Sequence, residues 1–139
     1  NCVCNSKEEG IGLLSGCTGN SVTKNNVTNN SIGIYLRDSN HNIVYLNDIN
    51  DNLQNAISSG SENRWHSPEE ISYPCSGKGY TGFLGNYWSD YEGTDTDGNG
   101  LGDVSYRFEY NSQDDYPLMI PGCDLIRPKI IHKGMVIER

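Results

Sequence analysis

The residues best suited to chemistry lie in one acidic, glycine-rich segment, residues 85–103, which reads GNYWSDYEGTDTDGNGLGD. Gly100 takes the sixth place of an EF-hand-type loop, where the chain must turn sharply. Oxygen-bearing side chains at alternate places of such a loop converge on one hard cation. The spacing therefore predicts a calcium site whose side-chain ligands, at the first, third, fifth and ninth places, are Asp95, Asp97, Asn99 and Asp103.

The loop does not complete the coordination shell by itself. Leu101, at the seventh place, offers its backbone carbonyl, and Tyr106 stands at the twelfth place, where an EF-hand carries a bidentate Glu. A carboxylate from a more distant part of the chain, or water, must close the shell, and Asp114 and Asp115 are the favoured candidates. The alternative is an acidic, glycine-rich turn that binds no ion.

Three aromatic residues, Tyr87, Trp88 and Tyr91, stand just before the acidic loop. Aromatic rings can form a platform on which a sugar stacks, and they can also bury a large apolar surface. The second role is favoured, because the chain gathers its aromatic residues after Pro68, where the end of a repetitive fold needs a lid.

An internal repeat precedes these residues: residues 20–27 recur 22 positions later, at residues 42–49. A second match, offset by 21, places Ile11-Gly12-Leu13 on Ile32-Gly33-Ile34. Short alternating apolar runs are separated by Asn, Asp, Ser and Gly, which predicts strands and turns. Helices are disfavoured because no apolar stripe has a 3.6-residue period.

A repeat of this length is typical of one coil of a parallel β-solenoid, in which each strand pairs with its copy one coil away. Leucine-rich repeats have a similar period, but their Leu and Asn pattern is absent. Val22, Val44 and Trp65 would form one inward column, and Val27 and Ile49 a second. Asn in the turns tolerates a left-handed backbone, and stacked amides can bond from coil to coil, as predicted for Asn20, Asn42 and Asn63.

Composition narrows the possible partners. The chain has 139 residues, a net charge of -8 and 35% hydrophobic residues, which fits one domain without a thick aliphatic core. Without a basic stripe, nucleic acid is not an expected partner. No apolar run approaches the length of a membrane span. Cations and neutral sugars fit an acidic chain of this kind better.

Five cysteines allow up to two disulfides in an exported chain, with a connectivity that the sequence leaves open: Cys2, Cys4, Cys17, Cys75 and Cys123. The Cys2-x-Cys4 pair could bind a soft metal, but no second pair stands at ligand spacing, so a disulfide or a free thiol is favoured. Asn26 and Asn29 begin N-glycosylation sequences, which agrees with export.

The asparagine-rich repeats, then Asn63-Arg64-Trp65, GNYWSDY, DTDGNGLGD and finally DDYPLM at residues 114–119, resemble the C-terminal end of NosD-like proteins. These right-handed parallel β-helix proteins belong to the carbohydrate-binding and sugar-hydrolysis group. The resemblance implies an exported surface protein, as in methanogenic archaea. The family label implies a periplasmic accessory that delivers copper to nitrous oxide reductase. The chain departs from the family at Cys2-x-Cys4 and after residue 122.

Together these patterns predict an all-β fold: a short right-handed parallel β-helix of about three coils with an irregular, aromatic, metal-bound C-terminal cap. The coils are expected over residues 1–66 and the cap over residues 67–122. Residues 123–139 are expected to form a tail that either covers a sheet edge or is solvated. The first coil would expose unpaired backbone groups. Upstream coils of the same chain, a partner chain or a second copy are therefore expected at this edge.

The leading hypothesis is a calcium-stabilised extracellular module of the cell surface with a structural, adhesive or glycan-contact role. A copper-binding accessory is the first alternative, although no cluster of Met, His and Cys is evident. A polysaccharide-active enzyme is the second. No catalytic residues are predicted, because the acids of the coils, Asp38, Asp48 and Asp51, fall on different turns and no two carboxylates are expected to face each other.

Overall fold

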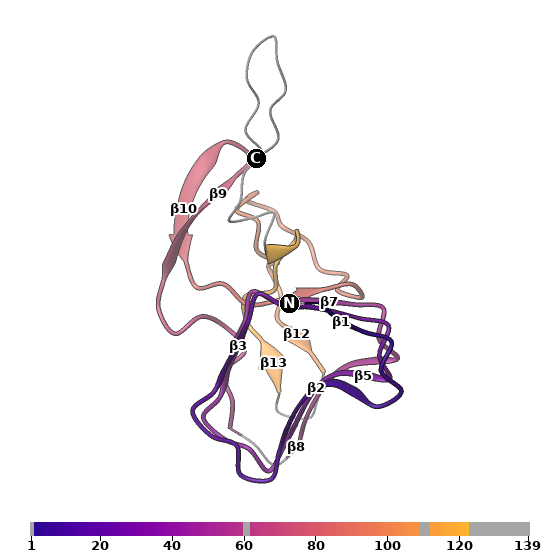
Figure 1. Ribbon diagram of the computed structural model, residues 1–139. Coiled ribbons are helices and arrows are strands. Elements are labelled where there is room, and N and C mark those ends of the chain that lie inside the picture. Colours follow the sequence, from indigo (N-terminus) through magenta and orange to yellow (C-terminus); the bar gives the residue numbers. More distant parts are fainter. Residues whose placement is uncertain (1, 60–61, 109–111, 123–139) are drawn as a thin grey trace, which may run out of the picture.

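Every named element of the computed structural model, which describes residues 2–59, 62–108 and 112–122, is a β-strand (Figure 1). The prediction of an all-β protein is confirmed. Parallel strands form three sheets, in the orders β1 (Cys2–Cys4), β4 (Asn26–Thr28), β7 (Asp48–Asn50), β11 (Tyr87–Trp88); β2 (Glu9–Leu14), β5 (Ile32–Arg37), β8 (Gln54–Ser59); and β3 (Ser21–Thr23), β6 (Ile43–Tyr45). Strands that are distant in sequence thus pair across successive turns of the chain, an arrangement compatible with a parallel β-helix.

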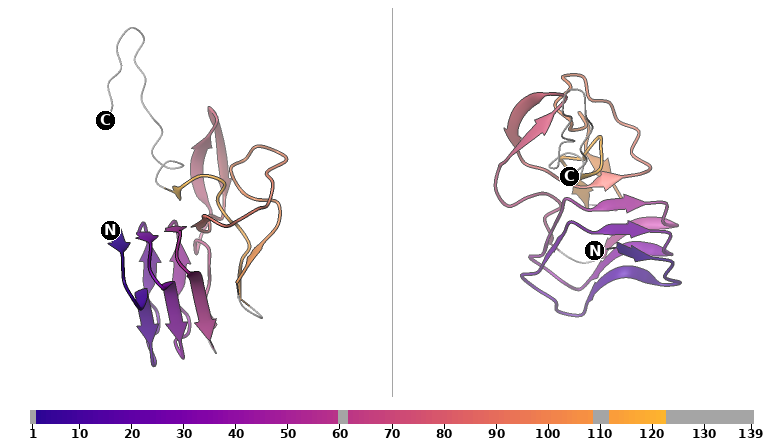
Figure 2. Two further views of the ribbon diagram at one scale, coloured as in Figure 1. Left: turned by 90° about the vertical axis from the view of Figure 1, so that its right-hand side faces the viewer. Right: turned by 45° about the horizontal axis from the view of Figure 1, so that its top comes forward.

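Two antiparallel hairpins follow the parallel sheets. The first pairs β9 (Ile71–Cys75) with β10 (Lys78–Gly82), and the second pairs β12 (Tyr106–Arg107) with β13 (Gln113–Asp114). Both lie at the end of the stack away from β1 (Figure 2). The tail predicted for residues 123–139, with Cys123, lies outside the described residues.

The repeat found in the sequence sets the register of two sheets. Val22 pairs with Val44, and Val27 pairs with Ile49. The match of Ile11 with Ile32 was wrong, because Ile11 pairs with Ile34 instead. The shift of two residues keeps the same side chains on the inner face, since strand side chains alternate with a period of two.

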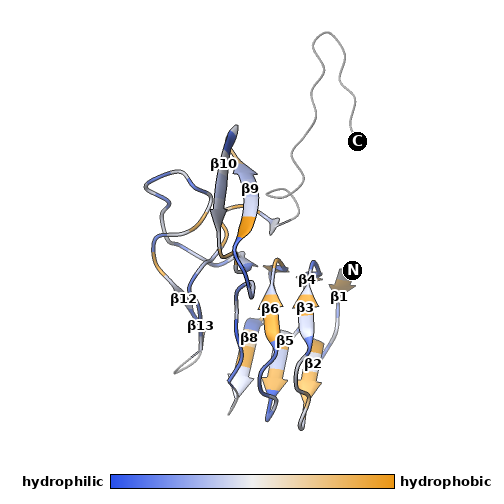
Figure 3. Cartoon of the chain, turned by 90° about the vertical axis from the view of Figure 1, so that its left-hand side faces the viewer, coloured by the Kyte–Doolittle hydropathy of each residue, from blue (hydrophilic) through white to orange (hydrophobic). Residues whose placement is uncertain are grey.

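The two predicted columns of apolar residues form the core. Val22, Val44 and Trp65 are buried in one cluster. Val27 and Ile49 are also buried there, and Trp88 extends their column because it pairs with Ile49. Apolar residues therefore gather on strands such as β2 and β6, with polar turns between them (Figure 3). The narrow core depends on the stacking of equivalent residues from turn to turn.

Ladders of asparagine side chains join the turns. The predicted ladder is confirmed: Asn20 Nδ2 donates to Asn42 Oδ1 at 3.0 Å, and Asn42 Nδ2 donates to Asn63 Oδ1 at 3.1 Å. Each receiving Oδ1 also accepts the backbone N–H of the preceding asparagine. Two further ladders end on carboxylates, namely Asn25, Asn47, Asn86 and Asp114, and Asn30, Asn52, Asn55 and Asp90.

The left-handed residues of the turns are not the ladder asparagines, contrary to the expectation from the sequence. Left-handed φ values of 52° to 58° occur one residue earlier. The left-handed residue turns the chain, and the asparagine after it points its amide along the stack. These pairs are Lys24-Asn25, Asn29-Asn30, His41-Asn42, Leu46-Asn47 and Asp51-Asn52.

Candidate metal centre

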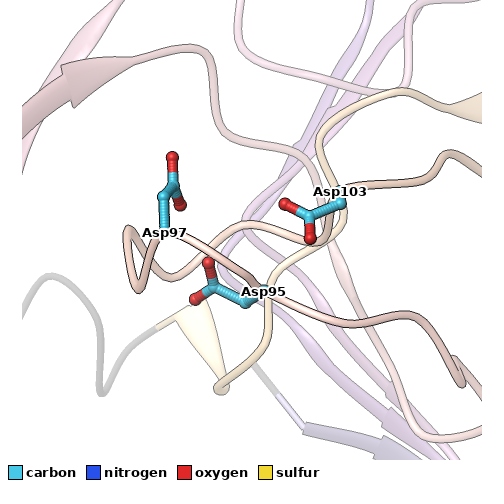
Figure 4. A group of neighbouring side chains, drawn as sticks. All are labelled: Asp95, Asp97 and Asp103. Carbon is cyan, nitrogen blue, oxygen red and sulfur yellow. The ribbon is translucent and has the colours of Figure 1, made fainter.

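The acidic loop brings together three of the predicted ligands. Carboxylate oxygens of Asp95, Asp97 and Asp103 all lie within 4.8 Å of one another (Figure 4). Asp95 is partly buried, whereas Asp97 and Asp103 are exposed. Within the described residues this is the single group of three or more His, Cys, Asp or Glu side chains close enough to hold one ion.

Asp95 organises the loop around its own carboxylate. Its Oδ1 accepts the backbone N–H of Gly98 at 2.9 Å and of Asn99 at 3.1 Å, and its Oδ2 accepts the backbone N–H of Gly100 at 2.8 Å. Gly98 and Gly100 have φ values of 72° and 88°, which glycine adopts without steric cost. The glycine spacing that predicted the site is therefore also what lets the loop close around its first carboxylate.

Asp103 closes the other side of the loop. Its Oδ2 accepts hydrogen bonds from the Thr96 N–H at 2.9 Å and the Thr96 hydroxyl at 2.6 Å, and these bonds lower the pKa of the Asp103 carboxyl. A carboxylate that stays ionised beside Asp95 and Asp97 gives the loop a concentrated negative charge. Carboxylate oxygens are hard ligands, which suit calcium and do not suit copper(I).

The first hairpin and the segment before residue 120 hold the loop in place. The Tyr73 hydroxyl donates to the Asn99 carbonyl at 2.8 Å, and the Met119 N–H donates to the Gly100 carbonyl at 2.9 Å. Burial, together with the nearby Cys75 and Asp97, raises the pKa of Tyr73 to about 12. Tyr73 is therefore a neutral donor that fixes the backbone of the loop.

The structure does not bring Asp114 or Asp115 into this group, so the prediction that they close the shell is wrong. Asp115 accepts a hydrogen bond from the Ser105 hydroxyl at 2.7 Å. Asp114 points into the protein, because the hairpin of β12 and β13 turns its side chain toward the core. Leu101 donates its N–H to Asn99 Oδ1 at 2.8 Å, and the role predicted for its carbonyl stays a prediction.

Asp114, which the sequence suggested as a metal ligand, is a buried hydrogen-bond acceptor. Its Oδ2 accepts the Asn86 N–H at 2.7 Å and the Trp88 Nε1–H at 2.9 Å, and its Oδ1 accepts the Tyr116 N–H at 2.9 Å. Burial raises its pKa to about 6, although the bonds from Trp88, Asn86 and Tyr116 oppose this shift. A Cβ atom at Gly85 would overlap this carboxylate, which explains the glycine that opens GNYWSDY.

The three aromatic residues do not form a sugar platform. Trp88 is 1% exposed, so a sugar cannot reach its ring, and this part of the alternative is wrong. Its indole stacks on Tyr106, with ring centroids 4.3 Å apart. Tyr87 and Tyr91 are partly buried against two different apolar clusters. Trp88 therefore packs on the last turn of the core.

Four further predicted positions, Cys17, Cys75, Asn26 and Asn29, are partly buried or exposed. Cys17 and Cys75 are thiols: Cys17 Sγ donates to the Leu14 carbonyl at 3.3 Å, and Cys75 Sγ donates to the Gly98 carbonyl at 3.6 Å. The structure therefore gives no support to a disulfide at either of them. Asn26 and Asn29 are exposed, and their glycosylation stays a prediction.

Fold and site define an all-β protein of stacked parallel strands, with an acidic loop beside the last turn. A family model described as "Periplasmic copper-binding protein (NosD)" matches residues 1–93, and the chain belongs to this family. The resemblance noted in the sequence is thereby confirmed over residues 1–93, a range that includes Cys2 and Cys4, where a departure from the family was expected. No curated protein and no solved structure matches the chain. In the described part of the chain, no helix has the length and apolar character needed to cross a membrane.

Proposed function

We propose that this chain is the capped end of an exported, right-handed parallel β-helix, and that one calcium ion in the loop of residues 95–103 stabilises the cap. Its role is structural, adhesive or glycan-binding, at the cell surface, and no catalytic step is proposed. The observation that supports this function is the convergence of Asp95, Asp97 and Asp103 on one space within a loop that is already wound around Asp95.

A divalent cation at this place offsets an electrostatic cost. Three carboxylates whose oxygens lie within 4.8 Å of one another repel each other. The loop bridges the cap, because the Gly102 N–H donates to the Pro117 carbonyl at 2.8 Å and Tyr73 bonds to Asn99 from the first hairpin. An ion that holds the loop therefore stabilises contacts with both the hairpin and residues 117–119.

Copper handling is the second candidate, and the family description favours it. The family match ends at residue 93, so it does not include the acidic loop. Among the described residues, no group of His and Cys side chains gathers as ligands for a soft metal. His66 Nδ1 lies 2.8 Å from the Ser67 carbonyl oxygen, and its ring makes edge contacts with the rings of Phe83 and Tyr116. Calcium is accordingly the first cation to test.

Calcium in the millimolar range is expected to raise the midpoint of thermal unfolding by several degrees relative to excess chelator. A site with a Kd near 10⁻⁴ M contributes about 1–2 kcal/mol under these conditions. Circular dichroism melting curves measure the shift. Asp97→Ala should abolish it, because Asp97 is an exposed ligand whose loss leaves the core intact.

The matched control for this measurement is Glu70→Ala, which removes an exposed acid outside the loop and should keep the calcium shift. An equal shift in both variants would show nonspecific screening and refute the loop site. Titration with copper(I) and a competing chelator separates the two candidates. Stoichiometric copper binding that survives Asp97→Ala, without a calcium shift, would establish the second candidate in place of the first.

A further inference from the structure

The acidic loop contains the single Asn-Gly sequence of the chain, Asn99-Gly100. In such a pair, the backbone nitrogen of the glycine can attack the side-chain carbon Cγ of the asparagine and close a five-membered ring. Glycine favours the attack because it has no Cβ atom, so its backbone reaches conformations that other residues avoid. Both reacting groups belong to one short segment, which makes the step unimolecular. The loop therefore carries a pair with intrinsic reactivity.

The closed loop holds both reacting groups in hydrogen bonds. The Gly100 N–H donates to Asp95 Oδ2 at 2.8 Å, so the proton that must leave before the attack is bonded to a carboxylate. The Asn99 side-chain oxygen accepts the Leu101 N–H at 2.8 Å, and this bond restrains the carbon that is attacked. Gly100 is also buried, which limits the access of hydroxide to its amide proton. In the closed loop the pair is therefore protected.

The asparagines of the ladders are protected more deeply. Asn30, as an example, is 2% exposed, and its Nδ2 donates to Asn52 Oδ1 at 3.1 Å and to the Val3 carbonyl at 3.2 Å. Ser31 follows it, and the side chain of a serine hinders the attack, whereas glycine does not. The ladder bonds break only when parallel strands separate, whereas the acidic loop lies outside the sheets and exposes Asp97. The loop therefore opens at a lower free energy than any ladder.

Exchange between a closed and an open loop determines the rate of the reaction. Opening of the loop alone exposes the Gly100 N–H while the stacked sheets stay folded. A cation that binds only the closed loop lowers the open population by about tenfold when its concentration is roughly ten times its Kd. This control by calcium rests on the proposed function, whereas the reactivity of Asn99 does not.

We propose that Asn99-Gly100 is a spontaneous deamidation site, which the closed loop protects and which reacts when the loop opens. Hydroxide removes the proton from the Gly100 nitrogen, and this nitrogen forms a bond to Asn99 Cγ. The bond between Cγ and Nδ2 breaks, and Nδ2 takes a proton from water and leaves as ammonia. A second water molecule opens the resulting succinimide ring at one of its two carbonyl carbons. The product is aspartate or isoaspartate at position 99.

The two products change the loop in different ways. Aspartate adds a carboxylate at the fifth place of the loop, and the number of charged ligands is one of the properties that set calcium affinity. Isoaspartate lengthens the backbone by one methylene group between the Asn99 and Gly100 nitrogens, which both donate to Asp95. The loop then cannot keep both bonds in their present geometry. A period without calcium therefore leaves a permanent change at the site.

The test is a time course of the full chain at mildly alkaline pH, in excess chelator and in calcium. Mass spectrometry of peptides locates the mass increase that accompanies the replacement of NH₂ by OH, and chromatography separates aspartate from isoaspartate. We expect conversion at Asn99 in chelator, and conversion slower by about tenfold when calcium is present at roughly ten times its Kd. Asn30 is the internal reference in the same samples and should stay unconverted over the same period.

Asp95→Ala removes the acceptor of the Gly100 N–H and should speed conversion in chelator by about tenfold or more, since a hydrogen bond to a charged group is lost. Glu92→Ala is the matched control: it removes an exposed acid just before the loop and should leave the rate unchanged. Circular dichroism of each variant shows whether the sheets are folded. If Asp95→Ala unfolds, hydrogen exchange of the Gly100 amide in the wild type decides. Exchange and conversion should then rise by the same factor as urea is added below the unfolding transition.

Absence of conversion at Asn99 in chelator, or equal rates in the wild type and a folded Asp95→Ala variant, would overturn the proposal. Amide exchange that rises with urea while conversion stays constant would overturn it as well. Faster conversion in Asp95→Ala, without any protection of the wild type by calcium, would support the deamidation site and refute the calcium site. The failure of this inference and the failure of the proposed function are therefore distinguishable.

Discussion

Replacement of Trp88 with alanine is expected to lower the free energy of unfolding by about 3–5 kcal/mol, as large-to-small changes of buried aromatic residues do. Trp88 is 1% exposed and extends the column of Val27 and Ile49 to the end of the core. Its ring stacks on Tyr106 at 4.3 Å. The substitution therefore removes the contact between the last parallel strand and the second hairpin, besides opening a cavity.

Urea denaturation monitored by circular dichroism measures this loss, and the fluorescence of Trp65, the other tryptophan, reports on the core separately. Trp88→Phe is the matched variant: it keeps a ring in the column but lacks the Nε1–H that donates to Asp114 at 2.9 Å. We expect a smaller loss of about 1–3 kcal/mol for it. A loss below about 1 kcal/mol for Trp88→Ala would contradict the packing role.

The features that the sequence predicted correctly are local or strictly periodic. Asp95, Asp97 and Asp103 lie within one loop, so their spacing alone indicated that they meet. The columns of Val22 and Val44 and of Val27 and Ile49 follow from a constant offset of 22 residues. Where the first turn is longer, the same reasoning failed, and Ile11 was matched with Ile32 instead of Ile34.

The features that the sequence did not predict depend on contacts between distant segments. Asp114 and Asn86 are 28 residues apart, and no repeat relates them. The acids Asp114 and Asp115 follow an acidic loop in the sequence, and this position suggested metal ligands. Asp114 faces the core instead, because it pairs with Tyr106 in the second hairpin. A pocket lined by Asn55, Asp90 and Tyr106 was equally hidden, because it needs the third asparagine ladder and the second hairpin at once.

The buried carboxyl of Asp114 makes stability depend on pH in an unusual direction. Its pKa is raised from 3.8 to about 6 by burial, and its hydrogen-bond partners are neutral N–H groups that supply no counter-charge. A raised pKa in the folded state means that the folded protein holds the proton more tightly than the unfolded chain. This contribution is complete below pH 3.8 and is lost as the pH rises through about 6.

We therefore expect the ionisation of Asp114 to lower the free energy of unfolding by up to about 3 kcal/mol between about pH 4 and pH 7, relative to a variant that cannot ionise there. Asp114→Asn is that variant, since its amide has the shape of the protonated acid and keeps an oxygen for the bonds from Asn86 and Trp88. The difference in unfolding free energy between the two proteins, measured in urea at several pH values, isolates this carboxyl from all other groups. The free energy of unfolding of the asparagine variant should increase relative to that of the wild type as the pH rises. If the wild type instead becomes more stable relative to the variant as the pH rises, the three N–H donors affect the pKa of Asp114 more than burial does. Asp114 is then an ionised anchor of the asparagine ladder at every pH where the protein folds.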